Sequence, residues 1–528
     1  VDLMSCLKSM HIKGLKKFKD IEVNFNDHVN ILVGENEAGK STILEALKIV
    51  LNQQYKTADK AILNELFNRE DIEFFRLNPS INSLPLIVID LRLSLDKKEK
   101  NSEYFFGQMP GMKSPDFGIV FECKYNEELG QGLESEIQNG RIPLEYYSLS
   151  WKTYAGCAYQ IIKRPLKFIS IDTSTADKYA SFNYYNKMLF NNTCDDSIRI
   201  NAKNEFREKI SDAFSGLNLP KLSANERFGI DGKKVILENI ISIYEDGIPL
   251  ENKGSGKESL IKTKIALNKQ SSKLDVILME EPENHLSHSN LLKMLKTIEQ
   301  RQVNSQIIVA THSNMIASRL GLKNVKWITD NKIKSLEDIS CEETDFFSKA
   351  DNNEFLNLLL SEKTILVEGA TEYLLLPRFY EQIYNRTIEA DKITIISCGG
   401  IGYKHYLSVI KETNKRVAVI TDNDKKQNNL DESNKYNSEN KNTRIFMSED
   451  LKDEWTWEAA IYHRNISLME ELIEVKNGAD YLFHNQDYGQ ILGKMLNNKV
   501  DTAYKMLNTE IEYNIPDYVK EAFKWIRK

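Results

Sequence analysis

The chain has 528 residues and a formal net charge of −7, with 41% apolar and 28% charged residues. This length exceeds what one hydrophobic core usually supports, so two to four domains are expected. No apolar run approaches the roughly 18 residues of a membrane span, and the charge excludes a polycation, so a nucleic-acid surface would be a local basic groove. The six cysteines form no C-x-x-C pair, which argues against a zinc ribbon and favours a reducing cytoplasm.

The first elements alternate between strand and helix patterns. Residues 7–15 and 20–27 alternate apolar and polar side chains and are predicted to be strands. A buried strand at 28–34 runs into a glycine turn, and an amphipathic helix follows at 40–52. Further strands are predicted at 83–95, at 117–125 and within 140–172.

The later segments change character twice. Residues 175–245 are polar and helical, whereas 272–330 return to a strand–helix–strand pattern. Residues 331–360 are predicted to be a polar connection with a short helix, and a new α/β pattern begins at Thr364. The segment 425–442 is rich in Asn and Lys and is predicted to be a mobile loop. The chain is therefore expected to be of the α/β class.

A phosphate-binding turn follows the strand at 28–34. The sequence GENEAGKS fits the pattern G-x-x-x-x-G-K-[ST], with a strand before it and a helix after it. Lys40 is predicted to reach the β- and γ-phosphates of ATP, and Ser41 to hold Mg²⁺. The residues predicted to bind the nucleotide here are Gly34, Asn36, Gly39, Lys40, Ser41 and Thr42.

Two downstream strands end in polar residues that suit the same chemistry. VILMEEPENHL carries Glu280 at a metal-coordinating position and Glu281 at a water-activating position. The first of these acids is usually Asp, so Glu280 departs from the pattern. IIVATHS ends at His312, which is predicted to sense the γ-phosphate. A Gly/Ser-rich turn, ENKGSGKES, lies at residues 251–259.

These four stretches, in this order, resemble the ABC-type ATPase heads of the RecF/SMC class. The resemblance implies that Ser255 and Gly256 contact the γ-phosphate bound by a second subunit. A homodimer or homotetramer would then complete the ATP sites. The glutamine that such heads place between these motifs is left unassigned.

A second set of acids follows the strands of the C-terminal region. Glu368 ends the strand of TILVEG and Glu372 lies four residues on, while Asp422 and Asp424 follow the apolar run VAVIT. Residues i and i+2 of an extended chain share a side, so the two aspartates are expected side by side. Clustered carboxylates need cations, and oxygen ligands select Mg²⁺ or Mn²⁺. Two such ions are a known apparatus for phosphodiester cleavage.

This acid pattern resembles a Toprim domain, and its E-x-x-x-E form resembles the OLD (overcoming lysogenisation defect) family. That family joins an ABC-type ATPase head to a C-terminal Toprim nuclease. The resemblance implies that Glu458, in WTWEAAI, is a further metal ligand and that Lys499 stabilises charge on the scissile phosphate. Glu454 is an alternative for the acid, and Lys494 for the lysine.

The resemblance also implies a domain plan. It predicts an ATPase head over residues 4–174 and 246–345, a helical dimerisation insertion over 175–245, a linker over 346–362 and a Toprim nuclease domain over 363–528.

The implied function is that of an ATP-binding, metal-dependent DNA endonuclease in anti-phage defence. Relatives include the Gabija nuclease subunit and retron effectors, so a retron reverse transcriptase with its msDNA is one partner to consider. The alternative is a non-nucleolytic RecF/SMC-like ATPase clamp, which leaves the C-terminal acids without a role. A topoisomerase, a primase and a transporter ATPase fit the residues less well.

Overall fold

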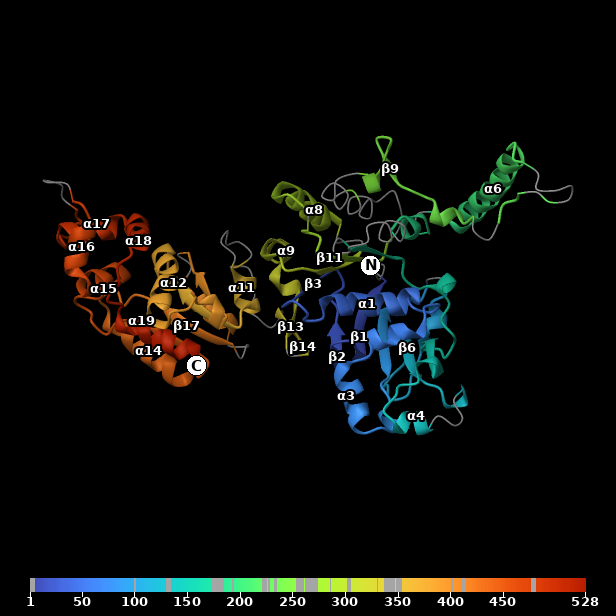
Figure 1. Ribbon diagram of the computed structural model, residues 1–528, viewed down its shortest axis with the longest axis horizontal. Coiled ribbons are helices and arrows are strands. Elements are labelled where there is room, and N and C mark those ends of the chain that lie inside the picture. The colour runs from blue at the N-terminus through green and yellow to red at the C-terminus, as the bar shows by residue number, and fades with distance from the viewer. Residues whose placement is uncertain are drawn as a thin grey trace. The chain divides into compact units, whose positions relative to one another are not determined.

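The computed structural model describes residues 5–98, 101–129, 134–172, 185–191, 194–220, 226, 228–231, 235–252, 261, 274–284, 286–301, 305–329, 331–336, 347, 354–399, 402–410, 415–475 and 481–528. The chain divides into two compact units, Val1–Asp338 and Ile339–Lys528, and each is described by itself (Figure 1). Within these described ranges, no helix is both long and apolar enough to cross a membrane.

The first unit begins with an antiparallel sheet in the order β2-β1-β4-β6-β5, with β7 paired to β6. Strand β4 (Ile87–Ser94) alternates buried and partly exposed residues along its whole length. This period of two is that of a strand with one face on a core. The other strands are β1 (Cys6–Leu15), β2 (Phe18–Asn24), β5 (Phe106–Gly107), β6 (Asp116–Tyr125) and β7 (Tyr147–Thr153).

The second sheet of this unit has the order β14-β13-β3-β12-β11-β8 and is parallel except for β14. Its central strands β3, β12 and β11 are buried at every position, as expected for parallel strands covered on both faces. The strands are β3 (Val29–Gly34), β8 (Phe168–Asp172), β11 (Val276–Glu280), β12 (Gln306–Ala310), β13 (Val325–Thr329) and β14 (Lys332–Ser335).

Helix α1 (Lys40–Asn52) contacts strands of both sheets, and its bounds are those predicted from the sequence (Figure 1). Aromatic side chains hold the end of this helix: Trp151 Nε1 donates to Ile49 O, and Tyr159 Oη donates to Leu51 O, both at 2.8 Å. The remaining elements of the unit are α2 (Leu63–Leu66), α3 (Arg69–Leu77), α4 (Glu134–Gln138), α6 (Asp196–Ser215), β9 (Tyr244–Glu245), β10 (Ile248–Pro249), α8 (His288–Arg301) and α9 (Asn314–Leu320).

The second unit is built on a parallel sheet in the order β16-β15-β17-β18. Helix α19 packs on β15, β17 and β18, and α12 packs on β16 and on α18. The strands are β15 (Lys363–Val367), β16 (Ile393–Ser397), β17 (Arg416–Ile420) and β18 (Thr443–Phe446). The helices are α11 (Phe355–Leu360), α12 (Ala370–Tyr384), α13 (Tyr403–Ile410), α14 (Gln427–Glu439), α15 (Trp457–Arg464), α16 (Ile466–Leu472), α17 (Gln490–Asn497), α18 (Lys499–Leu507) and α19 (Asp517–Arg527).

The prediction of a mobile loop over residues 425–442 is wrong, because this segment contains helix α14. Its composition has low helix propensity, so contacts with the sheet stabilise it instead. Leu430 is buried. The Asn437 side chain donates to Ile445 O and accepts from Ile445 N, both at 2.8 Å, and so binds the backbone of β18.

Candidate functional site

The first candidate site lies in the turn between β3 and α1. Gly39, the residue before α1, has a φ of 108°, in the left-handed region. A Cβ on Gly39 would come within 2.2 Å of the Phe18 ring, so glycine is required unless the ring moves. Asn36 and Ser41 are exposed beside this turn, whereas Thr42 is buried. The turn has the character of a phosphate-binding loop at a helix N-terminus.

Lys40 folds back over this turn. Its Nζ donates to two carbonyl oxygens of the loop, those of Gly34 at 2.9 Å and Glu35 at 3.1 Å. Burial lowers the pKa of Lys40, and the negative charges of Glu281 and Glu280 act against that decrease. The ammonium group therefore interacts with both the loop and the acids that follow β11.

The acid pair ends β11, two strands away from β3. Glu280 is the last residue of the strand and is buried, while Glu281 has a φ of 43° and donates its N–H to Ala310 O at 2.8 Å. His312 Nε2 lies 3.7 Å from Glu281 Oε1. Burial and then the charge of Lys40 lower the pKa of His312, so its imidazole is neutral at pH 7.

The sheet order explains why these motifs meet. Strand β12 lies between β3 and β11, and all three are parallel, so the residues that follow them share the carboxyl edge of the sheet. The structure thus brings together the loop, His312 and the acid pair. Ser255 and Gly256 lie outside the described residues, so their role remains a prediction.

Sequence reasoning missed Glu283 in this site. Glu283 Oε1 accepts hydrogen bonds from Thr311 Oγ1 at 2.5 Å and from the His312 N–H at 3.1 Å. Its other oxygen, Oε2, is buried and has no hydrogen-bond partner among the residues that the structure describes. The available signal was a third acid in EEPENHL, two residues after Glu281.

The second candidate site lies at the carboxyl edge of the sheet in the other unit. Glu368 follows β15, and Asp422 follows the neighbouring strand β17. Glu368 Oε1 accepts a hydrogen bond from Thr421 Oγ1 and another from the Asp422 N–H at 3.3 Å. Glu372 lies in the first turn of α12, where it is buried and accepts from Thr371 Oγ1 at 2.9 Å.

An acid and a lysine from later helices join this group. Lys499, the first residue of α18, forms an ion pair with Glu458 of α15, with Nζ 3.0 Å from Oε2. The two alternatives have other partners. Glu454 Oε1 accepts from Arg464 Nε at 2.5 Å, and Lys494 Nζ donates to the carbonyl of Glu474.

Burial and the neighbouring acids raise the pKa of Glu372 and of Asp422. Burial is the largest cause that raises the pKa of Asp422 well above its usual value, and the charges of Glu368, Glu458 and Glu372 add to it. Burial alone would lower the pKa of Lys499, but Glu458 raises it overall. The site therefore contains four carboxylates and one lysine, a charge imbalance that favours binding of cations.

Asp424 does not follow the predicted geometry. Strand β17 ends at Ile420, and Asp424 is exposed with a φ of 53°, so the two aspartates are not on one side of an extended chain. Between them, the fully buried side chain of Asn423 donates to the carbonyl oxygens of Ser448, Asp450 and Glu454. Asn423, which sequence reasoning missed, fixes this loop.

The donor set suits a divalent metal ion. Glu458 is 3% exposed, and apart from the ion pair with Lys499 its carboxylate oxygens have no hydrogen-bond partner among the described residues. Hard oxygen donors with excess negative charge are ligands for Mg²⁺ or Mn²⁺. In the arrangement observed for the described residues, no three His, Cys, Asp or Glu side chains are close enough to hold one ion. Binding would therefore require rotation of the long glutamate side chains.

Two known domain families match the chain. Residues 359–424 match the family described as "Overcoming lysogenization defect protein-like, TOPRIM domain", and residues 6–138 match "AAA ATPase domain". The chain thus joins an ATPase domain to an OLD-like Toprim domain, which confirms the class predicted from the motifs. Domains of these kinds use a nucleotide and a divalent metal.

The chain is also homologous to endonucleases over most of its length. It is 22% identical over 454 residues to Endonuclease GajA of Bacillus cereus (strain VD045), covering 79% of this chain and 74% of that protein. It is 20% identical over 649 aligned residues to Endonuclease GajA of Bacillus cereus (strain HuB5-5), covering 96% and 94%. A solved SMC head bound to the C-winged helix domain of ScpA aligns at 16% identity and a TM-score of 0.35, covering 63% of this chain and 99% of that one.

Proposed function

We propose that the chain is an ATP-binding, divalent-metal-dependent DNA endonuclease. The observation that carries the proposal is the cluster of Glu368, Glu372, Asp422 and Glu458 beside Lys499, in which Glu372 and Glu458 are buried. This group lies in an OLD-like Toprim unit, and the chain is similar to the GajA endonucleases over most of its length. An ATPase clamp would leave these mutually repelling acids without a purpose.

The acids are proposed to hold metal, and the lysine to hold phosphate. Bound Mg²⁺ or Mn²⁺, two ions in this proposal, would supply a hydroxide nucleophile and stabilise the leaving oxygen. Lys499 places its ammonium beside these acids, where it stabilises negative charge on the scissile phosphate. Glu368 accepts the Asp422 N–H and so holds the two strand ends in register. The proposed metal ligands are Glu368, Glu372, Asp422, Asp424 and Glu458.

The first site is proposed to bind and hydrolyse ATP. Lys40 binds the β- and γ-phosphates, and Ser41 and Glu280 hold the Mg²⁺ of the nucleotide. Glu281 accepts a proton from the attacking water, and the neutral His312 beside it donates a hydrogen bond to the γ-phosphate.

The proposed assembly is a homodimer or homotetramer that acts on DNA. In it, Ser255 and Gly256 of one copy complete the ATP site of another, and residues 175–245 contribute to dimerisation. The proposed setting is anti-phage defence, with a retron reverse transcriptase and its msDNA as one partner to test. A plaque assay of cells that express the wild type or Asp422→Ala checks this setting: equal protection would contradict a defence role for the nuclease.

The proposal is tested by plasmid cleavage with Mg²⁺ or Mn²⁺, with and without ATP. Asp422→Ala should reduce cleavage at least about 100-fold, because it removes the acid at the centre of the group, while ATP binding stays intact. Asp431→Ala, an exposed acid on α14, is the matched control and should cleave as wild type. The lanes with ATP show whether the nucleotide activates or inhibits cleavage.

An ATPase clamp would behave differently in the same assay. It would hydrolyse ATP and bind DNA without cleaving it under any metal condition. Equal cleavage by wild type and Asp422→Ala would show that Asp422 is not a metal ligand. A titration of bound Mn²⁺ in wild type and Asp422→Ala separates an inactive nuclease from a clamp, because only the nuclease loses metal on substitution.

A further inference from the structure

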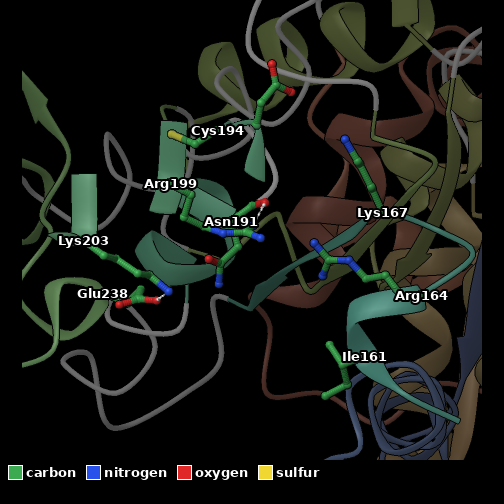
Figure 2. A pocket seen from close by; sticks show the side chains of 9 residues that line it. Ile161, Arg164, Lys167, Asn191, Cys194, Arg199, Lys203 and Glu238 are labelled. Carbon is green, nitrogen blue, oxygen red and sulfur yellow. Dashed lines mark hydrogen bonds and ion pairs between the residues drawn. The ribbon is translucent and has the colours of Figure 1, made fainter. Parts of the chain in front are cut away.

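The first unit contains a second concave site that the ATP site does not use. It is a cavity of about 480 Å³ between the segment that precedes β8 and the beginning of α6 (Figure 2). A cavity of a few hundred cubic ångströms is of the size that binds small ligands in proteins. None of the lining residues that the structure describes belongs to the phosphate-binding turn or to the acids described above.

Four cationic side chains line this cavity from two sides. Arg164 and Lys167 come from the segment before β8, and Arg199 and Lys203 come from α6 (Figure 2). Arg199 and Lys203 are four residues apart, so they lie on the same face of the helix. The cavity thus gathers four cations in a protein whose net charge is −7.

Among the described residues, fewer acids than cations line the same space. Lys203 forms an ion pair with the buried Glu238, and Asp195 precedes α6. Arg199 Nη1 donates to the Asn191 carbonyl at 3.1 Å, which fixes its direction. Among the described residues that line the cavity, four are cationic and two are acidic, a balance that would attract an anion.

The cavity lies away from the proposed ATP site. Lys167 directly precedes β8, and its N–H donates to Asp275 Oδ2 at 2.7 Å, just before β11 begins. These residues mark the amino edge of the parallel sheet. The phosphate-binding turn follows the carboxyl end of β3, at the opposite edge.

We propose that this cavity binds a phosphate ester of nucleotide size, either a free mononucleotide or the terminal nucleotide of a DNA strand. Guanidinium groups such as Arg164 and Arg199 match the oxygens of a phosphate with paired hydrogen bonds. Lys167 adds a third positive charge. Ile161 supplies an apolar wall against which the sugar or base can pack.

The test uses the full chain with Lys40→Ala, so that the phosphate-binding turn does not compete. The probes are dTMP, a 5′-phosphorylated oligothymidylate and the same oligonucleotide without the phosphate. Binding is measured by calorimetry at low salt. At least one phosphorylated probe should bind, and Arg164→Gln or Lys167→Gln should weaken it about tenfold or more, because each removes a charge-assisted contact. The probe that binds identifies the source of the phosphate.

Two controls keep the result specific. Lys209→Gln removes an exposed cation of the same helix that does not line the cavity, and should leave affinity unchanged. Arg164→Lys keeps the charge and should retain more affinity than Arg164→Gln. The proposal is overturned if neither phosphorylated probe binds, if Arg164→Gln weakens binding of the unphosphorylated strand as much as that of the phosphorylated one, or if Lys167→Gln, at an exposed position, binds as well as Lys209→Gln.

Discussion

Glu281 is the residue on which the proposed ATP hydrolysis depends. Its position beside His312 is that of a general base, so Glu281→Gln should reduce ATP turnover about 100-fold or more while ATP remains bound. Turnover and retention of labelled ATP measure the two effects separately. Glu70→Gln, an exposed acid of α3, serves as the control. Undiminished hydrolysis by Glu281→Gln would mean that another base acts.

Asp391 gives the second unit a pH-dependent contribution to stability. The Tyr380 hydroxyl donates to it, and Arg386 and Arg527 pair with it at 3.1 Å, which together lower its pKa. The ionised form therefore stabilises the fold. This contribution is present above the unfolded pKa of about 3.9 and disappears as the pH falls through the lower folded pKa.

Urea unfolding at a series of pH values tests this assignment. Asp391→Asn should be less stable than wild type at pH 7, and the difference in unfolding free energy should shrink below about pH 4. Asp453→Asn, another acid of the same unit, provides a comparison. A difference that stays constant with pH would show that the charge of Asp391 is not the cause.

Single residues also show which parts of the candidate site could be predicted from the sequence and which could not. The motifs identified Glu368, Glu372 and Asp422 because each follows or flanks a predicted strand. Asn423 was missed, because its role depends on three carbonyl groups that come from 25 or more residues later in the chain. Glu283 was missed for a similar reason, since its partners Thr311 and His312 follow another strand.

At the scale of elements, a cation–π contact ties two loops of the second unit together. Lys425 Nζ lies 4.2 Å from the ring centroid of Trp455 and 4.6 Å from that of Tyr488, and it donates to Tyr488 Oη at 3.1 Å. Lys425 directly follows Asp424 and has a φ of 61°. The contact therefore links the aspartate loop to the segment before α17.

Replacing Lys425 with Met should weaken this link. The Met side chain keeps an apolar stem but carries no charge. The substitution should therefore lower the free energy of unfolding by about 0.5–1 kcal/mol. Urea unfolding measures this loss, with Lys425→Arg expected to recover most of it and Lys426→Met, at the exposed neighbouring residue, as the control. Equal stability of Lys425→Met and wild type would show that the cation–π contact does not stabilise the unit.

Local pattern predicted some elements and failed for others. Helix α1 was predicted at its observed bounds, because its apolar periodicity and the preceding glycine turn agree. Helix α14 was missed, because its stability depends on pairing between Asn437 and β18 rather than on its own composition. The pairing of β4, β6 and β7 was likewise not predicted, since register across separate strands has no local signal.

At the scale of the whole molecule, the two compact units predict two separable unfolding transitions. A non-hydrolysable ATP analogue should raise the free energy of unfolding of one unit, and Mn²⁺ alone should raise that of the other. Each increase should be about 2.7 kcal/mol at a ligand concentration of 100 times Kd. Calorimetry of the full chain measures both. Lys40→Ala should abolish only the first shift and Asp422→Ala only the second. A single transition that both ligands shift together would contradict independent sites.

The covering of the sheet of the second unit by α19 bears on the order in which the two units form during synthesis. Strands β15 and β17 emerge from the ribosome early in this unit, but the helix that closes their face is made at its far end. Domains fold as units during synthesis, in order from the N-terminus. We therefore expect each nascent chain to carry a folded first unit before the acids of the second unit are held in place.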